Sequence, residues 1–263
     1  METSANSASY PASGASVQLW RWLSSAAIFG CIVLNYWWNA RPANGQSMGT
    51  VSAQYPMLLT PAGWAFSIWG VIFLALAVYA VWQLLPAQRR NPLPDAVARP
   101  LTVASVAAAL WVVCFSYEAI GICTVLMLLT LSMLILAYGR ARRLVLERAS
   151  PRPSSWPLSL FMGWITVATA VNVTLGLRDL GWTAPLNLSV LLSVVLLAVV
   201  VALGLLLSSF FRDAVYPVVL AWGLLGIWYV RRFDVPELGW LALAGALLVA
   251  VGGITLAWRR HRA

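Results

Sequence analysis

Tryptophan and phenylalanine recur at helical spacing inside two long apolar segments of the sequence. In the first segment, Phe66, Trp69 and Phe73 stand at positions i, i+3 and i+7, which places them on one face of a helix. In the second segment, Trp164 and Asn172 share a face in the same way. Several wide rings beside one buried amide suit a flat apolar ligand. An aromatic stripe is also typical of a bundle core, so the spacing leaves both interpretations open.

The residues of ordinary catalytic or metal chemistry are not arranged to perform it. The single histidine, His261, lies in a basic tail, where it is a poor metal ligand or general base. The three cysteines fall in or beside apolar segments without CxxC spacing (Cys31, Cys114 and Cys123). This pattern indicates neither a zinc site nor a disulfide framework. We therefore predict no catalytic residues, no metal ligands and no required cofactor.

The composition places these residues in a membrane. Of the 263 residues, 61% are hydrophobic and 10% are charged, whereas soluble domains carry roughly 25% charged residues. All 17 basic residues are arginines, and the formal net charge is +9. Because these arginines stand between apolar runs and not along one basic face, they indicate membrane topology and not nucleic-acid binding.

Eight segments are apolar enough to cross a bilayer, which requires about 20 residues per helix. We expect an all-α polytopic membrane helix bundle of about eight transmembrane helices. All 14 prolines should lie outside these spans or within their first or last few residues, because a broken helical hydrogen bond is costly in lipid. The expected spans are residues 20–40, 61–85, 101–117, 119–138, 157–177, 186–210, 215–230 and 238–258.

The placement of the arginines predicts the orientation of the bundle. If the N-terminus is cytoplasmic, eight spans put 13 of the 17 arginines on the cytoplasmic side, in agreement with the positive-inside rule. Both termini are then cytoplasmic, and residues 1–19 form a disordered polar tail. Residues 41–60 become an outer loop that can pack down on the bundle. Residues 139–156 become a solvated cytoplasmic linker with five arginines.

Two motifs resemble those of the TspO/MBR family, the tryptophan-rich sensory or translocator proteins. The segment TPAGWAFSIWGVIF resembles the family's second transmembrane helix, with matches at Pro61, Trp64, Phe66, Trp69 and Phe73. The segment WITVATAVN resembles its fifth helix, with matches at Trp164, Ala168 and Asn172, and Trp111 stands where a third-helix tryptophan is expected. The sequence departs from the family pattern at Ala108, where an asparagine is expected, and in its three additional C-terminal helices.

The resemblance implies a five-helix membrane domain over residues 20–177, followed over residues 178–263 by three additional transmembrane helices and a basic tail. It implies a sensor or transporter with a cavity for porphyrins, haem-like tetrapyrroles or other flat hydrophobic molecules, capped by residues 41–60. It also implies a homodimer in a bacterial inner membrane. The ligand-binding residues carried over are Trp64, Phe66, Trp69, Phe73, Trp111, Trp164, Ala168 and Asn172. Asn172 is expected to supply directional hydrogen bonding to the ligand.

Two other functions stay open. A secondary transporter usually carries ionisable groups at mid-membrane, whereas every acidic residue here lies at a span end or in a loop. Glu118, in the tight turn between the third and fourth spans, is the acidic residue placed to tilt inward. An enzyme that degrades porphyrins photochemically, a reaction proposed in the family, would use tryptophans as redox-active partners. We favour a binding protein over both.

Overall fold

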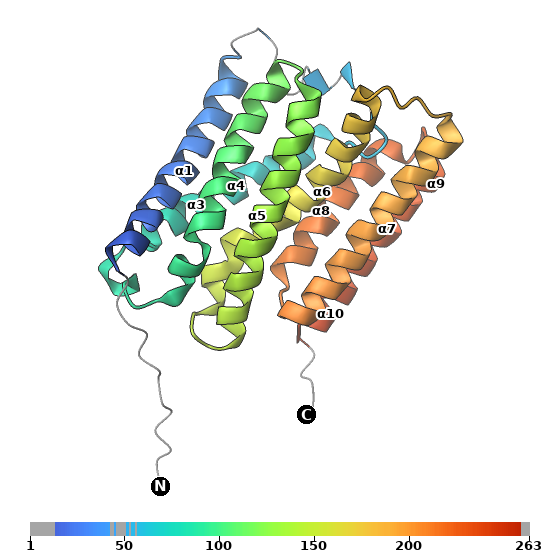
Figure 1. Cartoon of the computed structure of the whole chain (residues 1–263). Helices are drawn as coiled ribbons and strands as arrows, with labels where there is room; N and C mark the ends of the chain where they lie inside the picture. Colours follow the sequence, from blue (N-terminus) through green and yellow to red (C-terminus); the bar gives the residue numbers. More distant parts are fainter. Residues whose placement is uncertain (1–13, 43–44, 46–50, 53, 56, 259–263) are drawn as a thin grey trace.

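The computed structural model describes residues 14–42, 45, 51–52, 54–55 and 57–258. Within these residues, eight helical rods pack into one bundle, and α1 begins at the end of the bundle where α10 finishes (Figure 1). The rods are α1 (Ala15–Ala40), η1 with α3 (Gly63–Ser67 and Ile68–Trp82), α4 (Pro92–Ser116), α5 (Ile120–Leu146), α6 (Trp156–Asp179), α7 (Leu186–Phe211), α8 (Val215–Arg231) and the continuous α9, η4 and α10 (Pro236–Leu247, Leu248–Gly252 and Gly253–Trp258).

The all-α polytopic membrane bundle predicted from the sequence is confirmed. Among the described residues, six rods are long and apolar enough to cross a membrane by length and composition. The α8 helix is apolar but has 17 residues. At 1.5 Å per residue it is about 25 Å long, slightly shorter than a hydrocarbon core of about 30 Å. The α1 helix has 26 residues and runs along α4.

Several helices extend beyond the expected spans. Since α1 begins at Ala15, the last five residues of the expected tail 1–19 are helical, and residues 1–13 lie outside the described part of the chain. The α5 helix continues to Leu146, into the segment for which the sequence predicts a solvated linker. There Arg142 is 3% exposed. Its guanidinium donates hydrogen bonds to the main-chain carbonyls of Phe211 and Arg212, so Arg142 caps the end of α7.

The third span differs most from its prediction, because α4 begins at Pro92 and includes Pro100 in its interior. The expectation that proline avoids helix interiors is therefore wrong at this position. Proline has no N–H, so the carbonyl four residues earlier loses its helical donor. That carbonyl belongs to Ala96, and it accepts a hydrogen bond of 3.0 Å from Nη1 of Arg140 on α5. The neighbouring helix thus replaces the missing donor.

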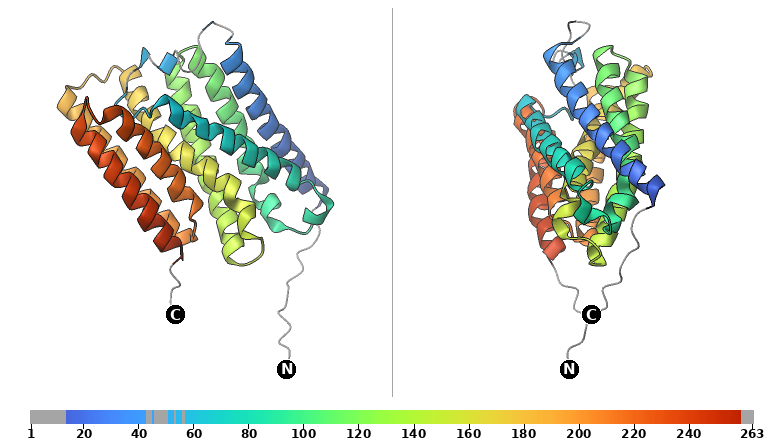
Figure 2. Two further views of the ribbon diagram at one scale, coloured as in Figure 1. Left: turned by 180° about the vertical axis from the view of Figure 1, so that it is seen from behind. Right: turned by 90° about the vertical axis from the view of Figure 1, so that its left-hand side faces the viewer.

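The α6 helix lies at the centre of the bundle. It packs against α3 and α5 and also against α7 and α8 (Figure 2). The approach of α8 is close at Gly223, where an added Cβ would lie 2.9 Å from Cγ1 of Val167. One cluster of buried apolar side chains extends from α1 to η4. The last three rods therefore share a continuous core with the first five.

Candidate functional site

A cavity of about 670 Å³ lies in the half of the bundle that carries the connection between α1 and α3. Its walls come from that connection, from η1 and from α1, α3, α4, α5 and α6. None of the described residues that line it carries a formal charge. Its volume falls within the range of about 300–1,000 Å³ that is typical of small-molecule sites.

Aromatic side chains from α3 and α6 form one wall of the cavity. The ring of Trp69 stacks on Phe73 at a centroid distance of 4.9 Å and meets Trp164 edge-on at 6.4 Å. Phe66 meets the same Trp164 ring edge-on at 5.5 Å. The helical spacing of Phe66, Trp69 and Phe73 therefore identified a real face of η1 and α3. That face points toward α6, and its rings line the cavity.

Seven of the eight predicted ligand-binding residues line this cavity. They are Phe66, Trp69, Phe73, Trp111, Trp164, Ala168 and Asn172. The two motifs that stand far apart in the sequence are thus brought to one place by the packing of α3, α4 and α6.

Trp64, the eighth residue that the family resemblance implies, is not among the residues that line the cavity. Its ring meets Trp222 edge-on at 4.9 Å and Tyr229 edge-on at 6.0 Å, and both partners are on α8. The reason is helical geometry. A residue two positions before Phe66 and five before Trp69 does not share their helix face. Trp64 consequently packs against α8.

Asn172 already has partners within the protein. Its Oδ1 accepts a hydrogen bond of 3.0 Å from Nε1 of Trp111, and its Nδ2 donates to the carbonyl of Ala168 at 2.9 Å. The residue is 5% exposed. The amide thus fixes the Trp111 indole, which stacks on Phe115 at 4.8 Å. Ala108, where the family pattern has an asparagine, lines the cavity with a methyl group.

A polar strip that α1 contributes to the cavity was not predicted from the sequence. Asn35 and Asn39 stand one turn apart and both line it. Their Nδ2 groups donate to the carbonyls of Cys31 and Asn35, each at 2.9 Å. A side-chain amide has further donor and acceptor capacity beyond one such bond. Two asparagines at i and i+4 near the end of the first span are the signal that identifies this strip.

Charged residues stand at the loop end of the cavity, around Tyr55, which lines it. The Tyr55 hydroxyl donates a hydrogen bond of 2.8 Å to Oε2 of Glu118, and the Arg178 guanidinium lies 5.9 Å from the Tyr55 ring centroid. The hydrogen bond to Glu118, with smaller effects from desolvation and charge, raises the pKa of Tyr55 above its ordinary value. The hydroxyl therefore stays protonated at neutral pH, and Glu118 faces the α1–α3 connection.

The loop 41–60, which the family resemblance predicts to cap the cavity, contributes to its wall. Ser52, Tyr55, Met57 and Thr60 line the cavity. Residues 43–44, 46–50, 53 and 56 of this loop lie outside the described part of the chain. The C-terminal part of the loop thus contributes to the cavity wall, and capping by the loop as a whole stays a prediction.

The chain is similar to one known family along most of its length. The model of a family described as TSPO-like protein matches residues 21–255. The match includes α7, α8 and α9, so it extends beyond the residues 20–177 that carry the two motifs. No curated protein and no solved structure matches the chain.

Proposed function

The chain belongs to the TSPO-like protein family, and from this premise we propose that it binds flat hydrophobic molecules, such as porphyrins and other tetrapyrroles, within its membrane helix bundle. The observation that carries the proposal is the cavity of about 670 Å³ with aromatic walls. A site of this kind suits a sensor or a transporter of the bound molecule.

Apolar burial and ring contacts would supply most of the binding free energy. Removing apolar surface from water contributes about 25 cal/mol per Å², and each aromatic contact adds about 0.5–1.5 kcal/mol. Phe66 is 37% exposed, so part of its ring surface is open to a ligand. The Trp69 ring stands between Phe73 and Trp164 and extends this surface.

The uncharged lining constrains how a porphyrin would lie. An unpaired carboxylate is costly to bury in an apolar site, and the described lining residues include no cation. The guanidinium of Arg178 lies beside Tyr55 at the loop end of the cavity. The proposal therefore puts the macrocycle among the rings and its carboxylates toward Arg178.

The proposal includes a topology for the chain. Arg178 stands at the cavity end of the bundle, whereas Arg21 and Arg142 stand at the end where α1 begins and α5 finishes. With 13 of the 17 arginines on the cytoplasmic side, both termini face the cytoplasm of a bacterial inner membrane. Residues 20–177 then supply the cavity, and the three helical rods between Leu186 and Trp258 support it. A homodimer is the assembly that the family implies.

A matched pair of tryptophan variants tests the binding site. Purified protein in lipid nanodiscs is titrated with protoporphyrin IX in the dark, and affinity is followed by the porphyrin absorbance band. Trp69→Ala removes a cavity ring, and we expect its affinity to fall about tenfold or more, given about 1.4 kcal/mol per decade and the ring and burial terms lost. Trp64→Ala removes an equal ring outside the cavity and should bind as the wild type does. Equal affinities in the two variants would contradict the proposal.

Light-driven degradation of the porphyrin is the alternative that one observation favours, because Trp69, Trp111 and Trp164 all line the cavity. The same samples distinguish the two functions under illumination. Loss of porphyrin absorbance that requires light and Trp69 would indicate catalysis. Stoichiometric binding with a stable absorbance spectrum indicates binding alone.

A further inference from the structure

The α8 helix holds residues 57–65, the segment that precedes α3. Arg231, the last residue of α8, donates from Nε to the carbonyl of Leu58 at 3.0 Å and from Nη2 to the carbonyl of Met57 at 2.9 Å. Arg231 follows Leu58 by 173 positions and Met57 by 174 positions in the chain. The side chain of Arg231 is 13% exposed, so both hydrogen bonds are largely shielded from solvent.

Asp234 completes the arrangement around Arg231. Its carboxylate forms an ion pair with Nη1 of Arg231, the nitrogen that does not contact the segment. Burial acts in the opposite direction, but the hydrogen bond and the charge of Arg231 lower the pKa of Asp234 below its usual value. The carboxylate is thus ionised at neutral pH, and it orients the guanidinium so that its other two donors face Met57 and Leu58.

Further contacts fix the same segment along α8. The Ala62 N–H donates to the carbonyl of Gly226 at 3.1 Å, and Nε1 of Trp222 donates to the carbonyl of Ala65 at 2.8 Å. The close approach requires a glycine at position 226, since an added Cβ would lie 2.8 Å from Cβ of Ala65 and 2.9 Å from Cβ of Pro61.

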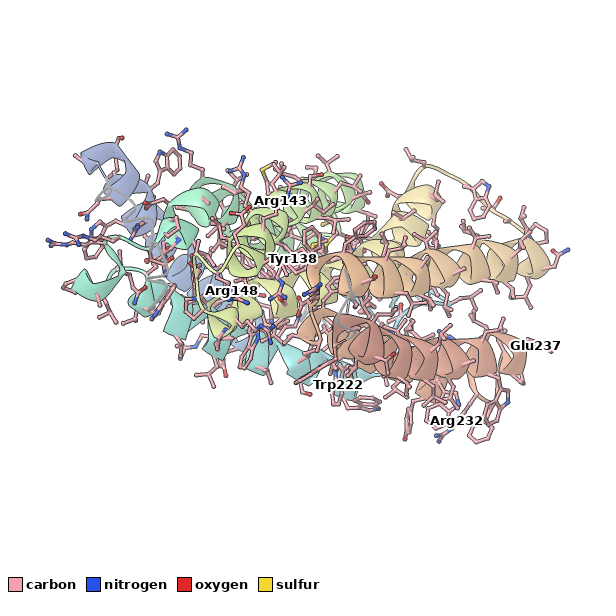
Figure 3. All side chains as sticks on the ribbon, turned by 90° about the horizontal axis from the view of Figure 1, so that it is seen from below. Tyr138, Arg143, Arg148, Trp222, Arg232 and Glu237 are labelled. Carbon is pink, nitrogen blue, oxygen red and sulfur yellow. The ribbon has the colours of Figure 1, made fainter. Side chains whose placement is uncertain are left out.

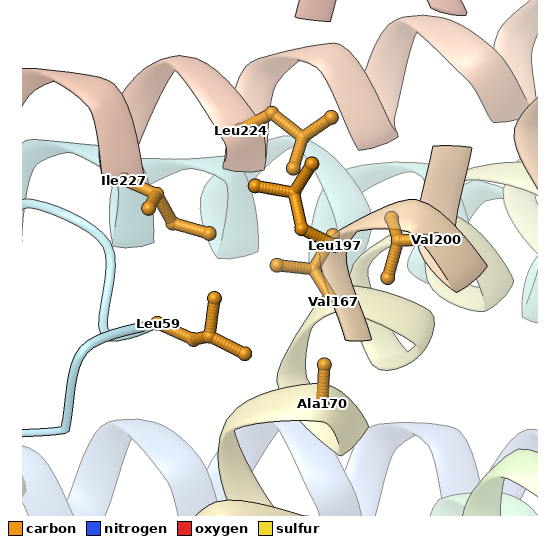
Figure 4. A pocket seen from close by; sticks show the side chains of 7 residues that line it. All are labelled: Leu59, Val167, Ala170, Leu197, Val200, Leu224 and Ile227. Carbon is orange, nitrogen blue, oxygen red and sulfur yellow. The ribbon is translucent and has the colours of Figure 1, made fainter. Parts of the chain in front are cut away.

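Leu59 anchors the segment by apolar contact. It is 2% exposed, and its side chain lies in a small apolar space where α6, α7 and α8 meet (Figure 4). The residues around it are Val167, Ala170, Leu197, Val200, Leu224 and Ile227. The segment is therefore bound to the C-terminal helices through both its backbone and its side chains.

The other side of this segment belongs to the cavity, because Met57, Thr60 and Pro61 line it. We propose that Arg231 is a positioning residue that holds residues 57–61 in place as a wall of the cavity and thereby retains the bound ligand. The part of this inference that concerns retention rests on the proposed function. The part that concerns the wall does not, since every contact involved is within the chain.

The neighbouring arginine provides a matched control. The guanidinium of Arg232 lies over the rings of Tyr229, Phe233 and Trp228, at 4.3, 4.8 and 5.4 Å from their centroids. Figure 3 shows its side chain at the outer edge of the C-terminal half of the bundle. Arg231→Gln and Arg232→Gln therefore remove the same charge from adjacent positions, and Arg231→Gln is the variant that removes the contacts to Met57 and Leu58.

Amide hydrogen exchange measures the wall directly. The full chain in nanodiscs, without ligand, is followed by mass spectrometry of the peptide over residues 57–66, which includes the Ala62 amide. We expect exchange in Arg231→Gln to be at least about tenfold faster than in the wild type, since charge-assisted hydrogen bonds are lost. Arg232→Gln should exchange at the wild-type rate. Equal rates in the two variants would overturn the positioning role.

Dissociation of protoporphyrin IX tests retention in the same samples. The bound porphyrin should leave Arg231→Gln several-fold faster than it leaves Arg232→Gln, and unchanged dissociation beside faster exchange would overturn the retention claim. If no variant binds the porphyrin, the proposed function fails, while the exchange result still decides the positioning role. Arg231→Lys keeps the charge but lacks the planar fork of donors. It should also exchange faster than the wild type, and it serves if Arg231→Gln does not fold.

Discussion

At the scale of single residues, the indoles near the cavity are held either by a hydrogen bond or by ring contacts. Trp111 is held by Asn172 and Trp222 is held by the carbonyl of Ala65, whereas Trp69 is held through ring contacts with Phe73 and Trp164. Asn172 therefore supports the cavity wall through Trp111. It also lines the cavity, and the direct ligand contact that the family resemblance implies stays a prediction.

Asn172→Leu should destabilise the protein by about 1–3 kcal/mol, because it leaves the indole N–H of Trp111 without its acceptor in an apolar environment. The free energy of unfolding in mixed micelles measures this loss. Thr174→Val is a suitable control on the same helix, since the Thr174 hydroxyl donates to the carbonyl of Val171 at 2.7 Å and serves no ring. A loss of equal size in the control would argue against a special role for Asn172.

At the scale of helices, the N-terminal part of α4 is held by other elements. Arg21 of α1 is 3% exposed and pairs with Asp95 in the first turn of α4. The same guanidinium donates to the carbonyls of Gln83, Gln88 and Asn91 at 3.2, 2.8 and 3.1 Å. Arg140 of α5 supplies the donor that Pro100 lacks. Both arginines stand at the end of the bundle opposite the cavity and do not line it, so they stabilise the helical frame.

Arg140→Gln should lower the free energy of unfolding by about 0.5–1.5 kcal/mol, which is the usual worth of one such hydrogen bond. The loss should shrink when Pro100→Ala is also present, because the introduced alanine has an N–H that can bond to the carbonyl of Ala96 within the helix. A double-mutant cycle measures this coupling. Arg143→Gln, an exposed charge change on the same helix, should show no coupling to Pro100→Ala. Additive effects of Arg140→Gln and Pro100→Ala would rule out the compensation.

Much of the architecture could be predicted from sequence because it depends on local composition. Apolar length located the eight rods, and the spacing of Phe66, Trp69 and Phe73 located the face that lines the cavity. Both features repeat along one helix, so they require no knowledge of what packs against it.

The features that sequence reasoning missed depend on contacts between distant segments. Trp64 turns toward Trp222, and Pro100 is tolerated because Arg140 lies beside it. The role of Arg231 depends on carbonyls 173 and 174 residues away. Backbone carbonyls carry no sequence signal, so the partner of such an arginine cannot be read from residue types.

At the scale of the whole molecule, the chain forms one core in which the first five rods enclose a cavity and the last three support its wall. The proposed function depends on this cavity, and a substitution at Gly70 can test it directly. Gly70 lines the cavity, and a Cβ added there would meet no atom within 4 Å. A leucine at this position adds side-chain volume at the cavity wall, where its Cβ meets no neighbour, and it removes a glycine from a helix, which favours folding.

The affinity of protoporphyrin IX for Gly70→Leu and Gly30→Leu in nanodiscs therefore tests the cavity most sharply. An added Cβ at Gly30 also meets no atom within 4 Å, but Gly30 does not line the cavity. We predict that Gly70→Leu folds as stably as the wild type and binds porphyrin at least about tenfold more weakly, given the apolar contact area that the leucine takes up. Gly30→Leu should bind as the wild type does. Wild-type affinity in a folded Gly70→Leu variant would show that the porphyrin does not bind in this cavity.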